Sequence, residues 1–105
     1  MGSLLYNGRK VGFDDRLLAH LHIVIVQKLR NGDSFAMSWL NALSIGDGRT
    51  SIWLDRTIPL VFDFAGSRSP VIDRAWLHAL TESADSSSGL LVIGEDGKLV
   101  RSGSR

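Results

Sequence analysis

The sequence contains no cysteine, only two prolines and no long apolar run. Without cysteine, disulfides, thiolate catalysis and cysteine metal clusters are all excluded. The longest apolar run, residues 23–26, is far too short to span a membrane. The first residues also lack the basic segment that opens a signal peptide. We therefore expect a cytoplasmic protein with no membrane partner.

A strong excess of either charge is also missing. Twelve basic residues face eleven acidic ones, for a net charge of +1, so electrostatics alone indicate neither nucleic acid nor an anionic membrane as a partner. Nine of the twelve bases are arginine, which suits bidentate contacts to carboxylate or phosphate. A coding bias is the simpler explanation of that preference.

The chain has the length and the apolar content of one ordinary globular domain. At 105 residues, with 44% hydrophobic and 22% charged residues, it is predicted to fold as a single domain over residues 1–101. The Ser-Gly-Ser-Arg end carries nothing apolar to anchor it, so residues 102–105 are expected to form a mobile tail.

The first third of the chain predicts a hairpin followed by a long helix. Asn-Gly at residues 7–8 joins strands expected at 3–6 and 10–13. A helix is predicted from Asp14-Asp15, whose carboxylates cap it, to Asn31-Gly32. Its buried stripe is predicted to consist of Leu17, Leu18, Leu21, Val24, Ile25 and Leu29.

Two apolar residues of this helix, Ile23 and Val26, fall off the buried stripe. Scattered apolar residues on a protein surface are ordinary, and this is the simplest interpretation. A homodimer contact or a covering loop is the alternative, so Ile23 and Val26 are candidate dimer contacts.

The rest of the chain predicts three strands, a second helix and a last strand. Strands at 33–41, 50–55 and 60–65 form an antiparallel meander in this prediction. Asp73 caps a second helix whose buried stripe is Trp76, Leu77, Leu80 and Ala84. Residues 90–93 are a short apolar strand candidate, followed by a Glu-Asp-Gly turn at 95–97 and by residues 98–101.

We therefore expect a two-layer α+β fold. It has one antiparallel sheet of about five or six strands, with both helices packed on one face. The elements follow in the order strand, strand, helix, three strands, helix, strand. Such a sheet leaves its other face bare, and Trp53 is predicted to lie there, opposite Ile52 and Leu54.

No group of residues has the spacing that a catalytic site or a metal site requires. His20 and His22 are about 200 degrees apart on a helix and cannot converge on one metal. His78 is expected to be solvated, and no serine stands in a Gly-x-Ser-x-Gly setting. Asp55 and Asp63, on neighbouring strands of the predicted meander, are interpreted as solvated charges rather than an acid/base pair. We expect no cofactor, metal or catalytic residue.

One surface does suggest binding. Trp53 with Arg49, Arg56, Arg68 and Arg74 would provide stacking and positive charge for single-stranded nucleic acid. The alternative is that Trp53 covers a core or a subunit interface and that the arginines pair with nearby aspartates.

A set of motifs spread over residues 6–91 resembles a known family. They are Phe13-Asp14-Asp15-Arg16-Leu17-Leu18, Ser34-Phe35 with Ser38-Trp39, Gly46-Asp47-Gly48-Arg49, Ser51-Ile52-Trp53-Leu54-Asp55, Ile58-Pro59-Leu60 and Arg74-Ala75-Trp76-Leu77. Together they resemble an uncharacterised family of actinobacterial single-domain proteins of about a hundred residues, whose members are often labelled ATP-dependent DNA ligase. The resemblance implies at most an association with DNA or a repair enzyme.

Ligase chemistry itself needs a lysine nucleophile in a Lys-x-Asp-Gly setting. None of Lys10, Lys28 and Lys98 has that context. We therefore expect a non-catalytic interaction module that self-associates as a homodimer. A nucleic-acid-associated accessory protein is the second reading, and an enzyme of undetected chemistry is the third.

Overall fold

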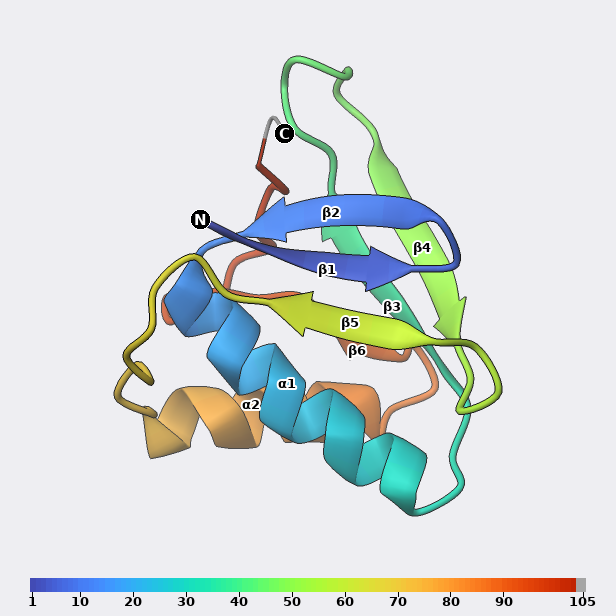
Figure 1. Cartoon of the computed structure of the whole chain (residues 1–105). Helices are drawn as coiled ribbons and strands as arrows, with labels where there is room; N and C mark the ends of the chain where they lie inside the picture. The colour runs from blue at the N-terminus through green and yellow to red at the C-terminus, as the bar shows by residue number, and fades with distance from the viewer. Residues whose placement is uncertain (104–105) are drawn as a thin grey trace.

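The computed structural model describes residues 1–103 and confirms the α+β class (Figure 1). The strands and helices, in chain order, are β1 (Gly2–Tyr6), β2 (Arg9–Phe13), α1 (Asp15–Arg30), β3 (Phe35–Leu40), β4 (Arg49–Leu54), β5 (Leu60–Asp63), α2 (Arg74–Ala84) and β6 (Leu90–Leu91). Their order agrees with the sequence prediction. Residues 104–105, the end of the predicted tail, lie outside the described part of the chain.

The strands form two three-stranded sheets, so the prediction of one sheet of five or six strands is wrong. Sheet A has the order β2-β1-β5 and sheet B the order β4-β3-β6. The predicted meander is wrong for the same reason: β4 pairs with β3, but β5 crosses to the other sheet and pairs with β1. Asp55 and Asp63 consequently do not lie on neighbouring strands.

The pairing of β5 with β1 follows from what each strand has to bury. Leu60 lies opposite Tyr6 and Phe62 lies opposite Leu4, in an antiparallel register. Alternate residues of a strand point to one face. This register therefore places the larger apolar side chains of β5 beside the buried Leu4 and Tyr6, over the shared core.

Sheet B is mixed rather than antiparallel, because β6 pairs in parallel with β3. A parallel neighbour needs a crossover connection, and α2 supplies it. After β6 the chain continues along sheet B, where the Leu40 N–H donates to Val100 O at 3.0 Å and the Ser102 N–H donates to Leu40 O at 2.8 Å. The predicted strand at 98–101 is reduced to isolated bridges from Leu99 and Arg101.

Each helix lies against a different sheet, and the two helices contact each other. α1 packs on β1, whereas α2 packs on β3 and β6. α1 is buried along the predicted stripe: five of the six residues are buried, and Leu29 is packed against the core. This replaces the predicted arrangement of both helices on one face of a single sheet.

The start of α1 is not capped as predicted. Asp14 occupies the N-cap position, but its side chain makes no capping hydrogen bond. The Asp15 carboxylate instead accepts from the Gly66 N–H at 2.8 Å and the Ala65 N–H at 3.0 Å, which ties the helix to the end of β5. These hydrogen bonds, from Gly66 first, lower the pKa of Asp15.

The cap of α2 does follow the prediction. Asp73 accepts a hydrogen bond from the Trp76 N–H at 3.0 Å, which lowers its pKa. Trp76, Leu80 and Ala84 are buried along the helix.

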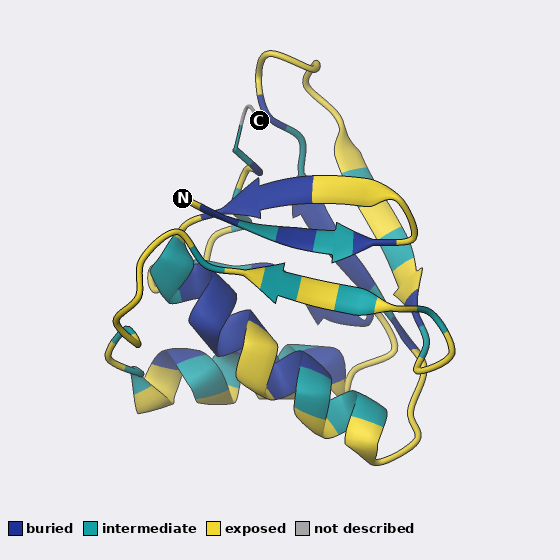
Figure 2. Ribbon diagram, viewed as in Figure 1, coloured by how far each residue is buried: buried dark blue, intermediate teal, exposed yellow. Residues whose placement is uncertain are grey.

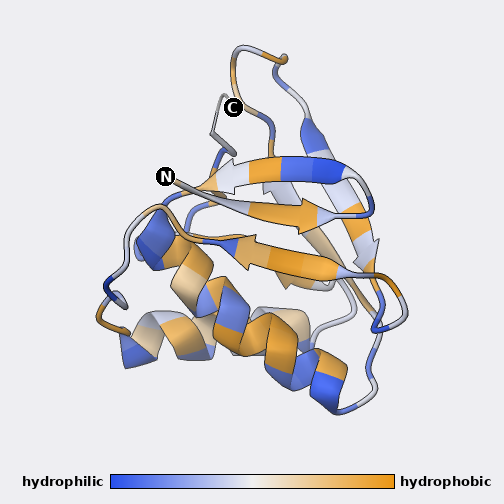
Figure 3. Cartoon of the chain, in the orientation of Figure 1, coloured by the Kyte–Doolittle hydropathy of each residue, from blue (hydrophilic) through white to orange (hydrophobic). Residues whose placement is uncertain are grey.

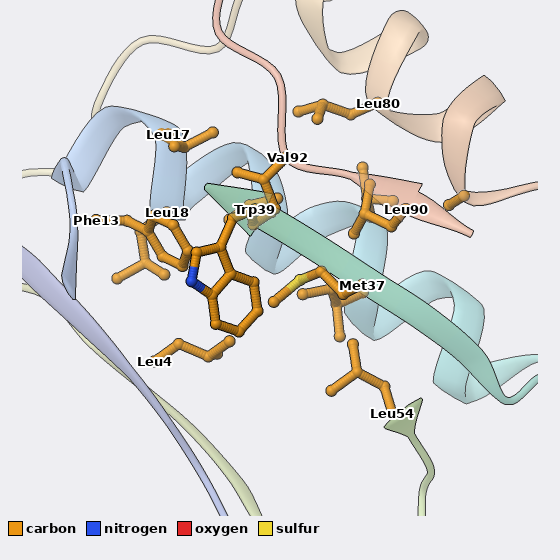
Figure 4. Close-up of a cluster of buried hydrophobic side chains, with 14 of the residues drawn as sticks. Leu4, Phe13, Leu17, Leu18, Met37, Trp39, Leu54, Leu80, Leu90 and Val92 are labelled. Atoms are coloured by element: carbon orange, nitrogen blue, oxygen red, sulfur yellow. The ribbon is translucent and has the colours of Figure 1, made fainter. Parts of the chain in front are cut away.

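The core lies between the two sheets and the two helices. Figure 4 shows the centre of this cluster, with Trp39 of β3 facing Phe13 and Leu18. The Phe13 and Trp39 rings meet edge to face with their centroids 5.8 Å apart. Trp39 thereby joins the last residue of β2, in sheet A, to the central strand of sheet B.

The first two residues of the predicted tail are hydrogen-bonded to the domain. Ser102 is buried against β3, and the Gly103 N–H donates to Gly12 O at 2.7 Å. Within residues 1–103, no helix combines the length and the apolar character that a membrane crossing requires.

Candidate interaction surfaces

A groove runs between α1 and β5. It consists of two hollows along α1: one of about 340 Å3 between α1 and the segment that follows β5, and one of about 370 Å3 between α1 and β5 itself. Figure 1 shows β5 as the strand of sheet A that lies beside α1. The first hollow is lined by Ala19, His22, Ile23, Phe64, residues 66–70 and Ile72, and the second by Val26, Leu29, Arg30, Arg56, Ile58, Pro59, Leu60 and Phe62. We call this surface the α1–β5 groove.

Helix and strand run in opposite directions along the groove. Successive turns of α1 contribute Ile23 to the first hollow and Val26 to the second, while β5 contributes Phe62 to the second. His22 lines the first hollow, with its ring centroid 4.7 Å from that of Phe62, which lines the second, and 6.2 Å from that of Phe64. Apolar side chains on its walls include Ile23, Val26 and Phe62. Most of β5 is orange, that is hydrophobic, in Figure 3.

Every charged residue that lines the groove is an arginine. Arg68 lies in the first hollow, and Arg30 and Arg56 lie in the second. Within residues 1–103, none of these three guanidinium groups forms an ion pair. Arg56 lies beside Gly32, at the C-terminal end of α1, where the helix dipole favours a cation. The charged side chains that line the two hollows are therefore all arginines.

The groove also exposes a free strand edge. β5 pairs with β1 on one side, and in the described chain no strand pairs with its other side. Proteins commonly protect such edges with lysine, proline or a covering segment. β5 contains only one charged residue, Asp63, and its Val61 side chain is 52% exposed. Figure 2 shows β5 alternating between exposed and half-buried residues.

A second surface surrounds Trp53 on the opposite sheet. As the alternation predicts, Leu54 is buried, Ile52 is half-buried and Trp53 is 58% exposed. Trp53 lies opposite Ala36, and the Trp53 carbonyl accepts a hydrogen bond from the Tyr6 hydroxyl. A hollow of about 260 Å3 adjoins the indole. We call this the Trp53 surface.

The hollow of the Trp53 surface is mostly polar. Lys28 lies in it and contacts Asp85 at 2.8 Å and Asp33 at 3.3 Å. The hydrogen bond to Asp85 is the main cause of the raised pKa of Lys28. Burial lowers this pKa, and the hydrogen bond to Asp33 raises it further. Ser86 and Ser87 line the same hollow. It therefore offers oxygen acceptors next to an exposed ring.

The five predicted binding residues are spread over several parts of the molecule. Arg49 and Trp53 share one face of β4. Arg56 and Arg68 line the α1–β5 groove, and Arg74 is exposed at the start of α2. The predicted dimer contacts are both in the groove, with Ile23 41% exposed and Val26 half-buried.

The sequence interpretation missed most of the groove, including His22, Arg30, Phe62 and Phe64. One signal was present: positions 23, 26 and 30 follow the i, i+3, i+7 spacing of a second helical stripe. The position of β5 beside this stripe depends on strand order, which the sequence pattern does not contain.

The two neighbouring histidines have separate roles in the fold. His22 packs on β5, whereas His20 is fully buried and stacks on Trp76 with ring centroids 4.2 Å apart. His20 Nε2 accepts from the Asp73 N–H at 2.9 Å, and its Nδ1 lies 2.6 Å from Arg16 O. A carbonyl only accepts, so Nδ1 carries the proton. In residues 1–103, no three histidine or carboxylate side chains converge to hold a metal ion.

Comparison with known families gives one match. A family model described as "Domain of unknown function (DUF7882)" matches residues 1–95. No curated protein and no solved structure matches the chain.

Proposed function

The chain belongs to the DUF7882 family, a domain of unknown function, and from the geometry of its surfaces we propose that it is a non-catalytic interaction module that forms a homodimer. The single observation that carries this proposal is the exposure of Trp53. Trp53 is 58% exposed on the edge strand β4, and tryptophan is enriched at protein interfaces, where its ring is buried and its N–H finds an acceptor.

The Trp53 surface is suited to pairing with a copy of itself. In a two-fold dimer the same patch serves both subunits, so each residue contact occurs twice. Trp53 stands beside the 260 Å3 hollow that it helps to line. A two-fold axis near Ala36 would let each indole enter the partner's hollow, where Asp33 and Asp85 offer acceptors for the indole N–H.

The test is the molar mass in solution. The wild-type chain is expected to approach twice its 11.5 kDa mass as concentration rises, measured by light scattering after size exclusion. Trp53→Ser is expected to leave a monomer. Val71→Ser removes a side chain that is 81% exposed on the loop before α2, and this control is expected to dimerise like the wild type. A mass of 11.5 kDa at every concentration would overturn the proposal.

A second candidate function is association with single-stranded nucleic acid. The observation that favours it is that Arg49, Ser51 and Trp53 alternate along one face of β4, which places an arginine and an aromatic ring on the same surface. Bases stack on such rings, while arginine contacts phosphate. The ligase label of the family that the motifs resemble suggests the same class of partner.

Nucleic-acid binding has a distinct signature. Affinity for a fluorescent oligothymidylate should fall steeply with salt, because phosphate contacts release counterions. Trp53→Ala and Arg49→Ala should each weaken binding, and Arg74→Ala is the control. Absence of binding at low salt would exclude this function and leave the homodimer untouched.

A further inference from the structure

We propose that the α1–β5 groove binds an acidic peptide segment, which adds to sheet A as a further strand along β5. This site is separate from the Trp53 surface, so the proposal does not depend on the homodimer. Three features of the groove carry it: the free edge of β5, the apolar walls beside it and the exclusive use of arginine among the charged residues that line it.

The free edge determines the conformation of the ligand. β5 offers the backbone groups of its outer edge, and an extended segment is the ligand that satisfies a row of such groups. Strand addition between an edge strand and a helix is an established mode of peptide recognition, in which backbone hydrogen bonds give affinity and side-chain pockets give specificity. α1 forms the second wall here, with Ile23 lining the first hollow and Val26 the second.

The walls determine the apolar pattern of the ligand. Side chains of an added strand alternate between two faces. Those on the inner face would enter the hollows between Ile23 and Val26 of α1 and Phe62 of β5. Those on the outer face would lie in solvent beside Val61. The ligand therefore has small apolar residues at alternate positions over a stretch that spans β5, which is 4 residues long.

The charges determine what flanks the apolar residues. Arg68 lies in the first hollow and Arg30 and Arg56 lie in the second, whereas the one carboxylate of β5, Asp63, is exposed on the face of the strand opposite to Phe62. Guanidinium groups pair best with carboxylates, in bidentate geometry. A segment with acidic residues on both sides of its apolar core complements this pattern.

The same charges argue against a second copy of the chain in this groove. Pairing two β5 edges would bring three arginines from each copy into one interface, and like charges placed together oppose association. We therefore assign the groove to a different polypeptide of acidic character.

The first experiment compares labelled peptides by fluorescence anisotropy. The probe is acetyl-Glu-Glu-Val-Thr-Val-Thr-Val-Glu-Glu-amide, and the control replaces its four glutamates by lysine. The acidic peptide is expected to bind with one-to-one stoichiometry and at least about tenfold more tightly than the basic one. Equal affinities, or no binding of the acidic peptide at low salt, would overturn the proposal.

The second experiment tests for strand addition with backbone methylation. One peptide carries N-methyl groups on the valines and another carries them on the threonines. In an antiparallel or parallel ladder only alternate N–H groups face the neighbouring strand. One methylated peptide should therefore lose binding while the other keeps it. Equal effects of the two patterns would show apolar adhesion without a ladder and would overturn the proposal.

The third experiment exchanges charges on the protein. The double variant Arg56→Glu/Arg68→Glu is expected to bind the acidic peptide about tenfold or more weakly and to prefer the lysine-flanked peptide. Arg49→Glu makes the same change on sheet B and is expected to bind like the wild type. Failure of the double variant to change the preference between peptides would contradict the assigned site.

A final measurement tests whether a second copy of the chain occupies the groove. Ile23→Glu places a carboxylate in the first hollow and is expected to weaken the acidic peptide while leaving the molar mass of the protein unchanged. If Ile23→Glu instead converts a wild-type dimer to monomers, the groove is a self-association site and the peptide proposal is overturned. Trp53→Ser tests the homodimer separately and is expected to bind the peptide like the wild type.

Discussion

At the scale of single residues, buried polar groups of this protein fix the joints between its segments. His20 is fully enclosed, and its two ring nitrogens contact backbone atoms of Arg16 and Asp73. It thereby connects α1 to the start of α2. The position was visible in the sequence, since residue 20 is three residues after Leu17 and four before Val24, on the buried stripe. The hydrogen bond to Asp73 was not, because it depends on how the helices meet.

His20→Leu is expected to destabilise the protein. The Asp73 N–H would lose its acceptor in a buried place, at a cost of about 1–3 kcal/mol. The free energy of unfolding, measured by urea denaturation, should fall accordingly. His78→Leu is the control, because His78 is exposed on α2 and makes only an ion pair with Glu82 on the surface. If both variants unfold at the same urea concentration, the hydrogen bond contributes nothing.

The lowered pKa values of three aspartates predict how the stability of the fold depends on pH. Hydrogen bonds from Gly66, Thr57 and Trp76 lower the pKa values of Asp15, Asp55 and Asp73, in that order. A carboxyl whose pKa is lowered on folding stabilises the native state above its ordinary value, 3.8, and loses that contribution as the pH falls through the lower native value.

Urea unfolding at a series of pH values should therefore show stability falling in acid. Asp15→Asn should be less stable than the wild type at neutral pH, and the difference should shrink below pH 3.8. Asp14→Asn, at the neighbouring N-cap position, is the control, because the Asp14 side chain makes no capping hydrogen bond. A difference that stays constant with pH would mean that the charge of Asp15 does not matter.

At the scale of elements, the parallel pair of β3 and β6 depends on a close approach at Gly89. This glycine has φ +79° and lies against β3, so that an added Cβ would meet Ala36 O at 2.5 Å. Gly97 has nearly the same backbone conformation, φ +80°, but has nothing within 4 Å of an added Cβ. Comparing substitutions at Gly89 and Gly97 therefore separates the cost of backbone strain from the cost of a steric clash.

Alanine substitution at these two glycines should differ in effect. Gly97→Ala should cost about 1–2 kcal/mol, the penalty of a left-handed conformation. Gly89→Ala should cost clearly more, because β6 has to move away from β3. Thermal and urea unfolding of both variants give the comparison. Equal losses would show that the contact with Ala36 is relieved at no cost.

The elements also show which parts of the fold a sequence can predict. Alternation of apolar residues correctly identified the faces of β3 and β4, and the apolar stripes identified both helices. Alternation does not specify which strand lies beside which. The turn at residues 55–59 is compatible with β5 folding back on β4 or crossing to β1, and the choice depends on the core that Leu4 and Phe62 complete together. The groove was missed for the same reason.

At the scale of the whole molecule, one core serves both sheets. Trp39 is 1% exposed and touches Phe13 across the interior. Because neither sheet has an independent core, the domain should unfold in a single cooperative transition.

Truncation of Trp39 should weaken both sheets together. Trp39→Ala is expected to cost about 3–5 kcal/mol, and Trp39→Phe provides a milder change if the first is too unstable to purify. Native-state hydrogen exchange should show equal loss of protection at amides of β1 and of β4. Trp53→Ala, on the surface, should leave protection of the core amides unchanged. Loss confined to sheet B would contradict a shared core.

The interleaving of the two sheets has a consequence for how the chain can be divided. The exposed loop around Gly46 separates a first part that holds β1, β2, α1 and β3 from a second part that holds β4, β5, α2 and β6. Each sheet takes strands from both parts. Because neither part holds a complete sheet, we expect a cut at this loop to produce two fragments that fold only when they are mixed. The protein is thus suited to serve as a split reporter of proximity between two fused partners.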